Sequence, residues 1–261
     1  MNRYFLYRKA WRFEGAPQQE TRLKKNEWKA LLRKGGLLVR NTYSFDQETE
    51  SDFWYVIKDD FCGFDELSPR VRNKIRHAQK TFDYQLIDQA LLLEKGYPII
   101  AETFADYAIK DRTMNEDDFK SYLDQPYFEY WGVFSKESSA LVGFCFVRRW
   151  NDSCEYDLSG MMTRYKHDGS YPYYGLYHAM NEYYLQEKGF KYVSDGTRSI
   201  TEHSHIHEYL IQNFNFRKAY CHLAVHYNWW MKIAVKILYP FRGIITIPQV
   251  KAILNMESMQ R

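Results

Sequence analysis

An acidic and a basic residue follow a short predicted strand at 192–195. Asp195 ends this strand, and Gly196 and Arg198 come directly after it. Side chains at the carboxyl end of a strand, and on the loop that follows it, often meet the substrate. Asp195 could therefore orient a substrate or accept a proton, and Arg198 could hold a carboxylate or phosphate through two parallel hydrogen bonds. The structural alternative is that Asp195 caps the next turn and Arg198 pairs with a neighbouring carboxylate.

Three histidines follow closely in the sequence, at His203, His205 and His207. His203 and His207 are four residues apart and would share one helix face, as metal-binding histidines do. The metalloprotease pattern also requires Glu directly after its first His, and Ser204 stands there, so we expect no metal site. We expect instead a single catalytic base, His203 or His205, near a helix start whose dipole lowers the histidine pKa. Surface or capping histidines are the alternative.

A second group of polar residues lies on a predicted strand at 154–163. Because side chains alternate along a strand, Glu155 and Asp157 share one face and Tyr156 lies on the other. We assign these three residues, together with Tyr173, to a substrate-binding surface. Burial in the core, with its hydroxyl hydrogen-bonded, explains Tyr156 equally well.

Hydrophobic periodicity predicts the elements that would position these residues. The expected strands are 36–43, 53–58, 82–87, 128–134, 140–150, 154–163, 192–195 and 217–227. The expected helices are 70–80, one opening at Pro98, one capped by Asn115, 176–188 and 203–213. Antiparallel strands that lead into a strand–helix–strand unit indicate a mixed α/β (α+β) fold. We divide the chain into 1–95, with N-terminal strands and a basic helix, and 96–261, the main domain with a C-terminal helix.

The segment 227–239 combines Trp229 and Trp230 with several aliphatic residues and with Lys232 and Lys236. Such an amphipathic helix is most often a terminal helix packed on the core. A peripheral contact with a membrane surface and a homodimer interface are the alternatives.

Composition excludes several classes of protein. The 261 residues carry a formal net charge of +3, too balanced for a surface that binds polyanions throughout. The four cysteines are far apart and lack metal-binding spacing, which indicates free thiols and a reducing cytoplasm. The N-terminus lacks the apolar region of a secretory signal, and no apolar run approaches the roughly 20 residues that span a bilayer.

The order of these elements resembles the GNAT acyltransferase fold, and three sequence stretches resemble its FemAB-type, GNAT-like branch. They are a basic helix and strand at 70–84, a central helix at 171–190 that ends in Lys-Gly-Phe, and the region 193–216 from Ser-Asp-Gly to Phe-Asn-Phe. The region that contains all three covers about three fifths of the chain. The resemblance implies a mostly antiparallel central sheet with flanking helices, in which the central strands 155–163 and 192–195 splay apart.

In this family, a loop between the first splayed strand and the next helix binds the acyl donor. The resemblance places that role on Met162, Thr163, Tyr165, Lys166, His167, Gly169, Ser170 and Tyr171. Only Gly169 matches the glycine pattern of family members that use acetyl-CoA, with Asp168 where a basic residue is usual. Ile211 stands where the family often has a proton-donating tyrosine.

The resemblance implies an N-acyltransferase that moves an acyl or aminoacyl group from a carrier to an amine. The donor would be acyl-CoA, as a co-substrate without any tightly bound cofactor, or aminoacyl-tRNA. The basic helix Arg70 to Lys80 is by default solvated, and a local contact with tRNA is its functional alternative. A catalytically inactive domain used for binding or assembly is the alternative that Ile211 and the altered loop suggest.

Overall fold

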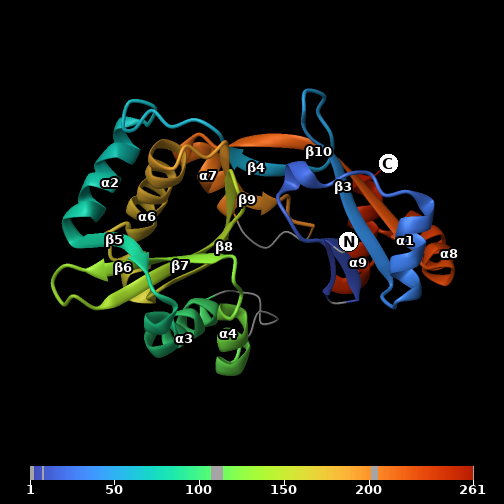
Figure 1. The fold of residues 1–261 in the computed structure, drawn as a ribbon, viewed down its shortest axis with the longest axis horizontal. Helices are drawn as coiled ribbons and strands as arrows, with labels where there is room; N and C mark the ends of the chain where they lie inside the picture. The colour runs from blue at the N-terminus through green and yellow to red at the C-terminus, as the bar shows by residue number, and fades with distance from the viewer. Residues whose placement is uncertain (1–2, 8, 107–113, 201–204, 261) are drawn as a thin grey trace. The chain divides into compact units, whose positions relative to one another are not determined.

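The computed structural model describes residues 3–7, 9–106, 114–200 and 205–260, and these form two compact units (Figure 1). Unit 1 comprises residues 1–56, 197–204 and 218–261, and unit 2 comprises 57–196 and 205–217. Three strands contain a boundary between the units: β4 (Trp54–Lys58), β9 (Tyr192–Thr197) and β10 (Arg217–Tyr227). The seam expected after residue 95 falls inside a helix of unit 2.

Unit 1 has a sheet in the order β1-β2-β3-β10. Its elements are β1 (Tyr4–Tyr7), β2 (Ala10–Phe13), a 3-10 turn (Pro17–Gln19), α1 (Lys25–Arg33), β3 (Leu38–Gln47), α8 (Trp229–Leu238), a second 3-10 turn (Tyr239–Phe241) and α9 (Pro248–Met259). The pairs β1/β2 and β3/β10 are antiparallel, whereas β2 and β3 are parallel. Leu31 and Leu32 of α1 pack on Val39 of β3 and form a small core. β1, β2, α1 and α9 were not predicted from the sequence.

Unit 2 has a sheet in the order β9-β8-β7-β6-β5. Its elements are α2 (Pro69–Thr81), β5 (Phe82–Ile87), α3 (Gln89–Ala105), α4 (Glu116–Leu123), β6 (Phe128–Ser135), β7 (Leu141–Arg149), β8 (Ser153–Met161), α5 (Thr163–His167), α6 (Pro172–Asn181), a π-helical turn (Glu182–Glu187) and α7 (Ile206–Phe214). β5, β6, β7 and β8 pair antiparallel, and β8 and β9 pair in parallel. The mixed, mostly antiparallel fold class is confirmed.

Helices cover both faces of the unit 2 sheet, with α2 and α6 on one side and α3 and α4 on the other (Figure 1). Tyr130, Phe144 and Phe146 pack on α3 and α4 in one hydrophobic cluster. Trp131 faces the other way, and its indole nitrogen donates to the Tyr184 hydroxyl at 3.1 Å. Neighbouring residues on a strand point to opposite faces of the sheet. The alternation of Tyr130 and Trp131 along β6 therefore provides packing contacts on both faces.

Helix α3 begins earlier than predicted. It starts at Gln89 and runs through Pro98, which the sequence suggested as the first residue of the helix. Leu92, before the proline, and Ile99 and Ile100, after it, belong to the same buried cluster. Burial of this apolar face on both sides of Pro98 outweighs the loss of one hydrogen bond inside the helix.

Helix α8 is also placed differently from the expectation of core burial. Val235 is its only fully buried residue, and both tryptophans are exposed. Among the described residues, no helix combines the length and apolar character needed to cross a membrane.

Helix α6 packs against β5 without room for a side chain at Gly175. A Cβ atom there would lie 2.2 Å from the Tyr84 hydroxyl and 2.3 Å from its ring. We expect Gly175→Ala to lower the free energy of unfolding by about 1–3 kcal/mol, the usual range for overpacking, as measured by urea denaturation. Tyr84→Ala should remove most of this extra loss, and Gly243→Ala, in open space, should have little effect. An equal loss for Gly175→Ala in both Tyr84 backgrounds would contradict this packing.

Candidate active site

The two central strands of unit 2 pair only at their amino-terminal ends. β8 and β9 are in register at Ser153↔Tyr192, Cys154↔Val193 and Glu155↔Ser194. No further pair joins these two strands in the part of the chain that the structure describes, although β8 continues to Met161. The strands therefore separate after Glu155 and Ser194, and Asp195 is the first residue beyond the last pair.

Asp195 contacts His207 of helix α7. The Nε2 atom of His207 lies 3.4 Å from the Asp195 carboxylate oxygen Oδ2 and 3.2 Å from the Asp195 carbonyl oxygen. The two side chains are 11% and 14% exposed, so the pair is largely shielded yet remains open to solvent on one side. Strand β9 and the first turn of α7 thus bring together a carboxylate and an imidazole.

Asp195 controls the protonation of His207. Burial lowers the pKa of His207, but the hydrogen bonds and the charge of Asp195 outweigh burial and raise this pKa above 6.5. With Nε2 facing two oxygen acceptors, the neutral ring keeps its proton on Nε2 and its lone pair on Nδ1. Nδ1 has no hydrogen-bond partner within the described residues. This geometry, in which a carboxylate orients an imidazole base, is typical of catalytic pairs.

Tyrosine rings of α6 and α7 lie near the pair. The Asp195 charge contributes, after burial, to the raised pKa of Tyr177. The Tyr177 ring stacks on Tyr173 with centroids 6.2 Å apart and lies 6.1 Å from the Tyr209 ring. The surroundings of Asp195 are therefore rich in aromatic rings.

His207 as the partner of Asp195 was missed by sequence reasoning. The predicted helix began at 203, which put His203 and His205 at its start, whereas α7 begins at Ile206. His205 precedes the helix with a fully exposed side chain. His203 lies outside the described residues. A helix predicted to begin at 206 instead of 203 would have placed His207 in its first turn. His207 would then have been a candidate partner of Asp195, because this helix follows the strand that contains Asp195.

Arg198 belongs to unit 1. Its guanidinium donates to the Asp52 carbonyl oxygen at 2.5 Å and lies over the Trp54 ring at 4.3 Å. Both partners are also in unit 1. A role for Arg198 in catalysis stays a prediction.

The three β8 residues assigned to substrate binding have different surroundings. Tyr156 is buried, and its hydroxyl donates to Asn181 Oδ1 at 2.8 Å. Asp157 receives hydrogen bonds at 2.7 Å from both Arg148 and the Tyr122 hydroxyl. The Glu155 carboxylate lies near Gly196, since a Cβ there would be 3.7 Å from its Cδ. The contacts of Tyr156 are those of a core residue, whereas Glu155 faces the point where the strands separate.

The segment expected to bind a donor contains a short helix, α5, and several of its backbone N–H groups are already engaged. The N–H of Met162 donates to Val142 O at 2.9 Å, and that of Thr163 donates to the Glu102 carboxylate at 2.7 Å. The Ser170 N–H donates to the Asp168 carboxylate at 2.8 Å. Two carboxylates thus occupy positions where a phosphate would need free donors.

Other side chains of this segment are also engaged. Lys166 pairs with Asp106 at 3.1 Å, and hydrogen bonds from Thr163 and then Lys166 lower the pKa of that carboxyl. The Tyr165 ring packs edge-on against Phe82 at 5.2 Å. His167 ends α5. Gly169 and Tyr171 both have positive φ, at 82° and 57°, and form the turn into α6.

The basic helix α2 contacts the tyrosines of this turn and of α6 through Lys74. The Nζ atom of Lys74 donates to the Tyr174 hydroxyl at 2.9 Å and lies over the Tyr171 and Tyr174 rings. Arg70, Arg76 and Lys80 are exposed. Lys74 of α2 therefore packs on α6, whereas Arg70, Arg76 and Lys80 are exposed to solvent.

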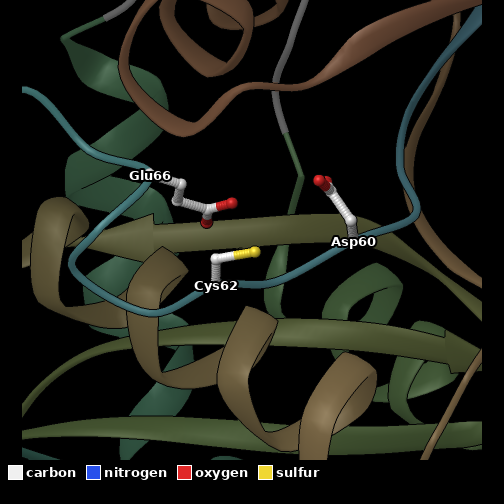
Figure 2. Close-up of side chains that lie close together, drawn as sticks. All are labelled: Asp60, Cys62 and Glu66. Atoms are coloured by element: carbon white, nitrogen blue, oxygen red, sulfur yellow. The ribbon is translucent and has the colours of Figure 1, made fainter.

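Three potential metal ligands, Asp60, Cys62 and Glu66, lie together after β4 (Figure 2). The buried ammonium group of Lys58 pairs with two of them, at 2.9 Å from Glu66 and 3.5 Å from Asp60. Since Lys58 already balances the carboxylates, we assign this group to an ion pair that satisfies a buried lysine.

No protein-family model matches the chain, and no curated protein matches it. Solved structures with a similar fold include FemX, with 11% identity and a TM-score of 0.51 over 74% of this chain and 65% of FemX. The chain thus spans less than two thirds of FemX. The C-terminal domain of a proposed lysylphosphatidylglycerol synthetase from Agrobacterium fabrum matches with 11% identity and a TM-score of 0.53, over 89% of this chain and 82% of that one. The chain therefore has a fold similar to those of FemX and of this synthetase domain.

Proposed function

We propose that this protein is an N-acyltransferase that moves an acyl or aminoacyl group from a carrier to a primary amine. The observation that carries the proposal is the pair Asp195–His207, placed where β8 and β9 separate. A transferase of this kind needs a base for the amine beside an opening that admits an extended donor. The half-buried ring of Tyr173, which stacks on the buried Tyr177, suits an opening of this kind, because it offers apolar surface with a polar edge.

The reaction follows from the protonation of this pair. Neutral His207 removes a proton from the attacking amine at Nδ1 while Asp195 stabilises the resulting imidazolium. The amine nitrogen forms a bond to the carbonyl carbon, and the bond from that carbon to the carrier oxygen or sulfur breaks. The imidazolium then returns its proton to the leaving oxygen or sulfur, so the enzyme ends in its starting state.

The contacts of the donor segment support an aminoacyl ester rather than acyl-CoA. A pyrophosphate at 162–171 would meet the carboxylates of Glu102, Asp106 and Asp168, which hold the N–H or hydroxyl groups of Thr163 and Ser170. Like charges at such short range are unfavourable. The residues present therefore do not fit the phosphates of CoA at this position.

The exposed cations of α2 support tRNA as the carrier. Arg70, Arg76 and Lys80 lie on a helix without any acidic residue, and cations of this kind contact nucleic-acid backbones without reading sequence. In such a contact, the positive charges of α2 would bind the tRNA backbone. The aminoacyl ester would then react at Asp195 and His207.

Transfer assays with the full chain test this proposal. We expect a labelled aminoacyl group to move from aminoacyl-tRNA to lysine, a lysyl peptide or an aminosugar, with no transfer from labelled acetyl-CoA. The triple variant Arg70→Glu, Arg76→Glu, Lys80→Glu should raise the KM for aminoacyl-tRNA at least tenfold and leave kcat nearly unchanged. Lys95→Glu, an exposed charge on α3, is the matched control. Transfer from acetyl-CoA alone would contradict the carrier, and tRNA binding without transfer would instead support a binding module.

A further inference from the structure

Exposed hydrophobic side chains are concentrated in one segment of unit 1. Eight of the thirteen large hydrophobic residues that are exposed in the described chain lie between 229 and 247. We call them the C-terminal apolar face: Trp229, Trp230, Ile233, Ile237, Leu238, Phe241, Ile244 and Ile247. Trp229 and Ile244 are 76% and 78% exposed. Exposed apolar side chains gathered in one segment are typical of an interaction site.

The outward side of helix α8 is apolar. Trp229, Ile233 and Ile237 follow each other at four-residue intervals and form one exposed stripe, while Val235 points to the core. Lys232 and Lys236 lie along one edge of this stripe and are also exposed. Lysines beside apolar rings can extend their ammonium groups to lipid headgroups while the rings enter the lipid.

The chain segment that carries this face has basic but no acidic residues. Residues 218–256 contain no Asp or Glu, and Lys232, Lys236, Arg242 and Lys251 are all exposed. None of these four cations forms an ion pair with any residue described in the structure. An anionic surface would therefore gain their full attraction.

A second basic region lies next to the start of α8. The N–H of Asn228 donates to Leu37 O at 3.2 Å, and its side-chain amide donates to Gly36 O at 2.8 Å. These contacts hold α8 beside the end of α1, where Arg33 and Lys34 are exposed. The basic surface thus continues from α8 to the end of α1.

We propose that unit 1 binds an anionic lipid surface through the C-terminal apolar face, with α8 lying in the plane of the headgroups. Tryptophans and flanking lysines suit this interface, and anionic headgroups match the cations. A second copy of the chain fits less well, because a symmetric contact would bring the same cations together.

Vesicle co-sedimentation of the full chain tests this proposal without any activity assay. We expect binding to vesicles of phosphatidylglycerol mixed with phosphatidylcholine, and much weaker binding to phosphatidylcholine alone. Ile233→Glu with Ile237→Glu should lower binding roughly tenfold or more, because charge enters the apolar stripe. Lys232→Glu with Lys236→Glu should lower it by at least about 25-fold on anionic vesicles only, because two attractive charges are lost and two repelled ones are added.

Matched variants in unit 2 control for general changes of charge and hydrophobicity. Leu86→Glu with Leu93→Glu alters two hydrophobic residues that are 41% and 42% exposed, and Lys95→Glu with Lys188→Glu makes the same change of charge. Both pairs should bind like the wild type. The proposal is overturned if both the α8 and the unit 2 variants bind like the wild type. It is also overturned if the wild type ignores anionic vesicles and instead forms a dimer that Ile233→Glu with Ile237→Glu abolishes.

Discussion

Replacing His207 by Gln is expected to lower kcat by roughly 10²- to 10⁴-fold, the usual contribution of a general base. Gln keeps a polar group near Asp195 but offers no basic nitrogen. Because the change acts on proton transfer rather than on donor binding, the KM for the donor should change little. Steady-state transfer assays measure both constants. His205→Gln is the matched control, since the His205 side chain is fully exposed two residues away.

The pH profile separates catalysis from a structural role. Since Asp195 raises the His207 pKa above 6.5, wild-type kcat/KM should rise with pH through an inflection above that value. Asp195→Asn removes the charge, so burial dominates and the inflection should move below 6.5 while the maximum rate falls. Folding raises the His207 pKa, so protonated His207 stabilises the protein at low pH, and this contribution disappears as pH rises through the folded-state pKa. Full activity of His207→Gln, or an inflection that Asp195→Asn leaves in place, would refute this assignment.

Glu66→Ala is expected to destabilise unit 2 by about 3 kcal/mol, because it leaves the Lys58 ammonium buried without its main partner. The Lys58 side chain is fully buried and that of Glu66 is 9% exposed, so water can replace little of the lost interaction. Asp60 remains 3.5 Å away, which keeps the loss at the lower end of the range for broken buried pairs. Denaturation monitored by circular dichroism measures the effect.

A double variant tests whether this loss comes from the unpaired charge. Lys58→Met with Glu66→Leu replaces the pair by apolar groups of similar size and should stay within about 1–2 kcal/mol of the wild type. Asp60→Ala is the control, because its side chain is 69% exposed and its contribution should be below about 1 kcal/mol. If Glu66→Ala and the double variant are equally unstable, Glu66 acts through packing and not through its charge.

The sequence predicted most of unit 2 because its elements carry strong local signals. Ser68 caps α2 by accepting from the Val71 N–H, and Asn115 caps α4 in the same way. Asn215, which follows α7, has a positive φ of 56°, a conformation that Asn tolerates better than most residues. Unit 1 was harder, since β1 and β2 are only four residues long each, and their hairpin joins the rest of the sheet through the pairing of β2 with the more distant β3.

The candidate site was predicted in part. Asp195 at the end of its strand followed from strand order, whereas His207 depended on the start of α7, and element boundaries are poorly marked when no capping side chain is present. The role of Glu102 could not be foreseen, because its contact with Thr163 joins residues 61 positions apart. Long-range contacts of this kind follow from how α3 packs on the sheet.

The division of unit 1 among three separate segments has a consequence for synthesis on the ribosome. Strand β3 is made before unit 2, but its partner β10 and the helices after it are made once unit 2 is complete. All of unit 2 is translated before residue 218, so it can assemble while β3, which pairs with β2 on one side, still lacks β10 on the other. An unpaired strand edge attracts other chains. Until β10 is made, the edge of β3 that pairs with it stays open to such contacts.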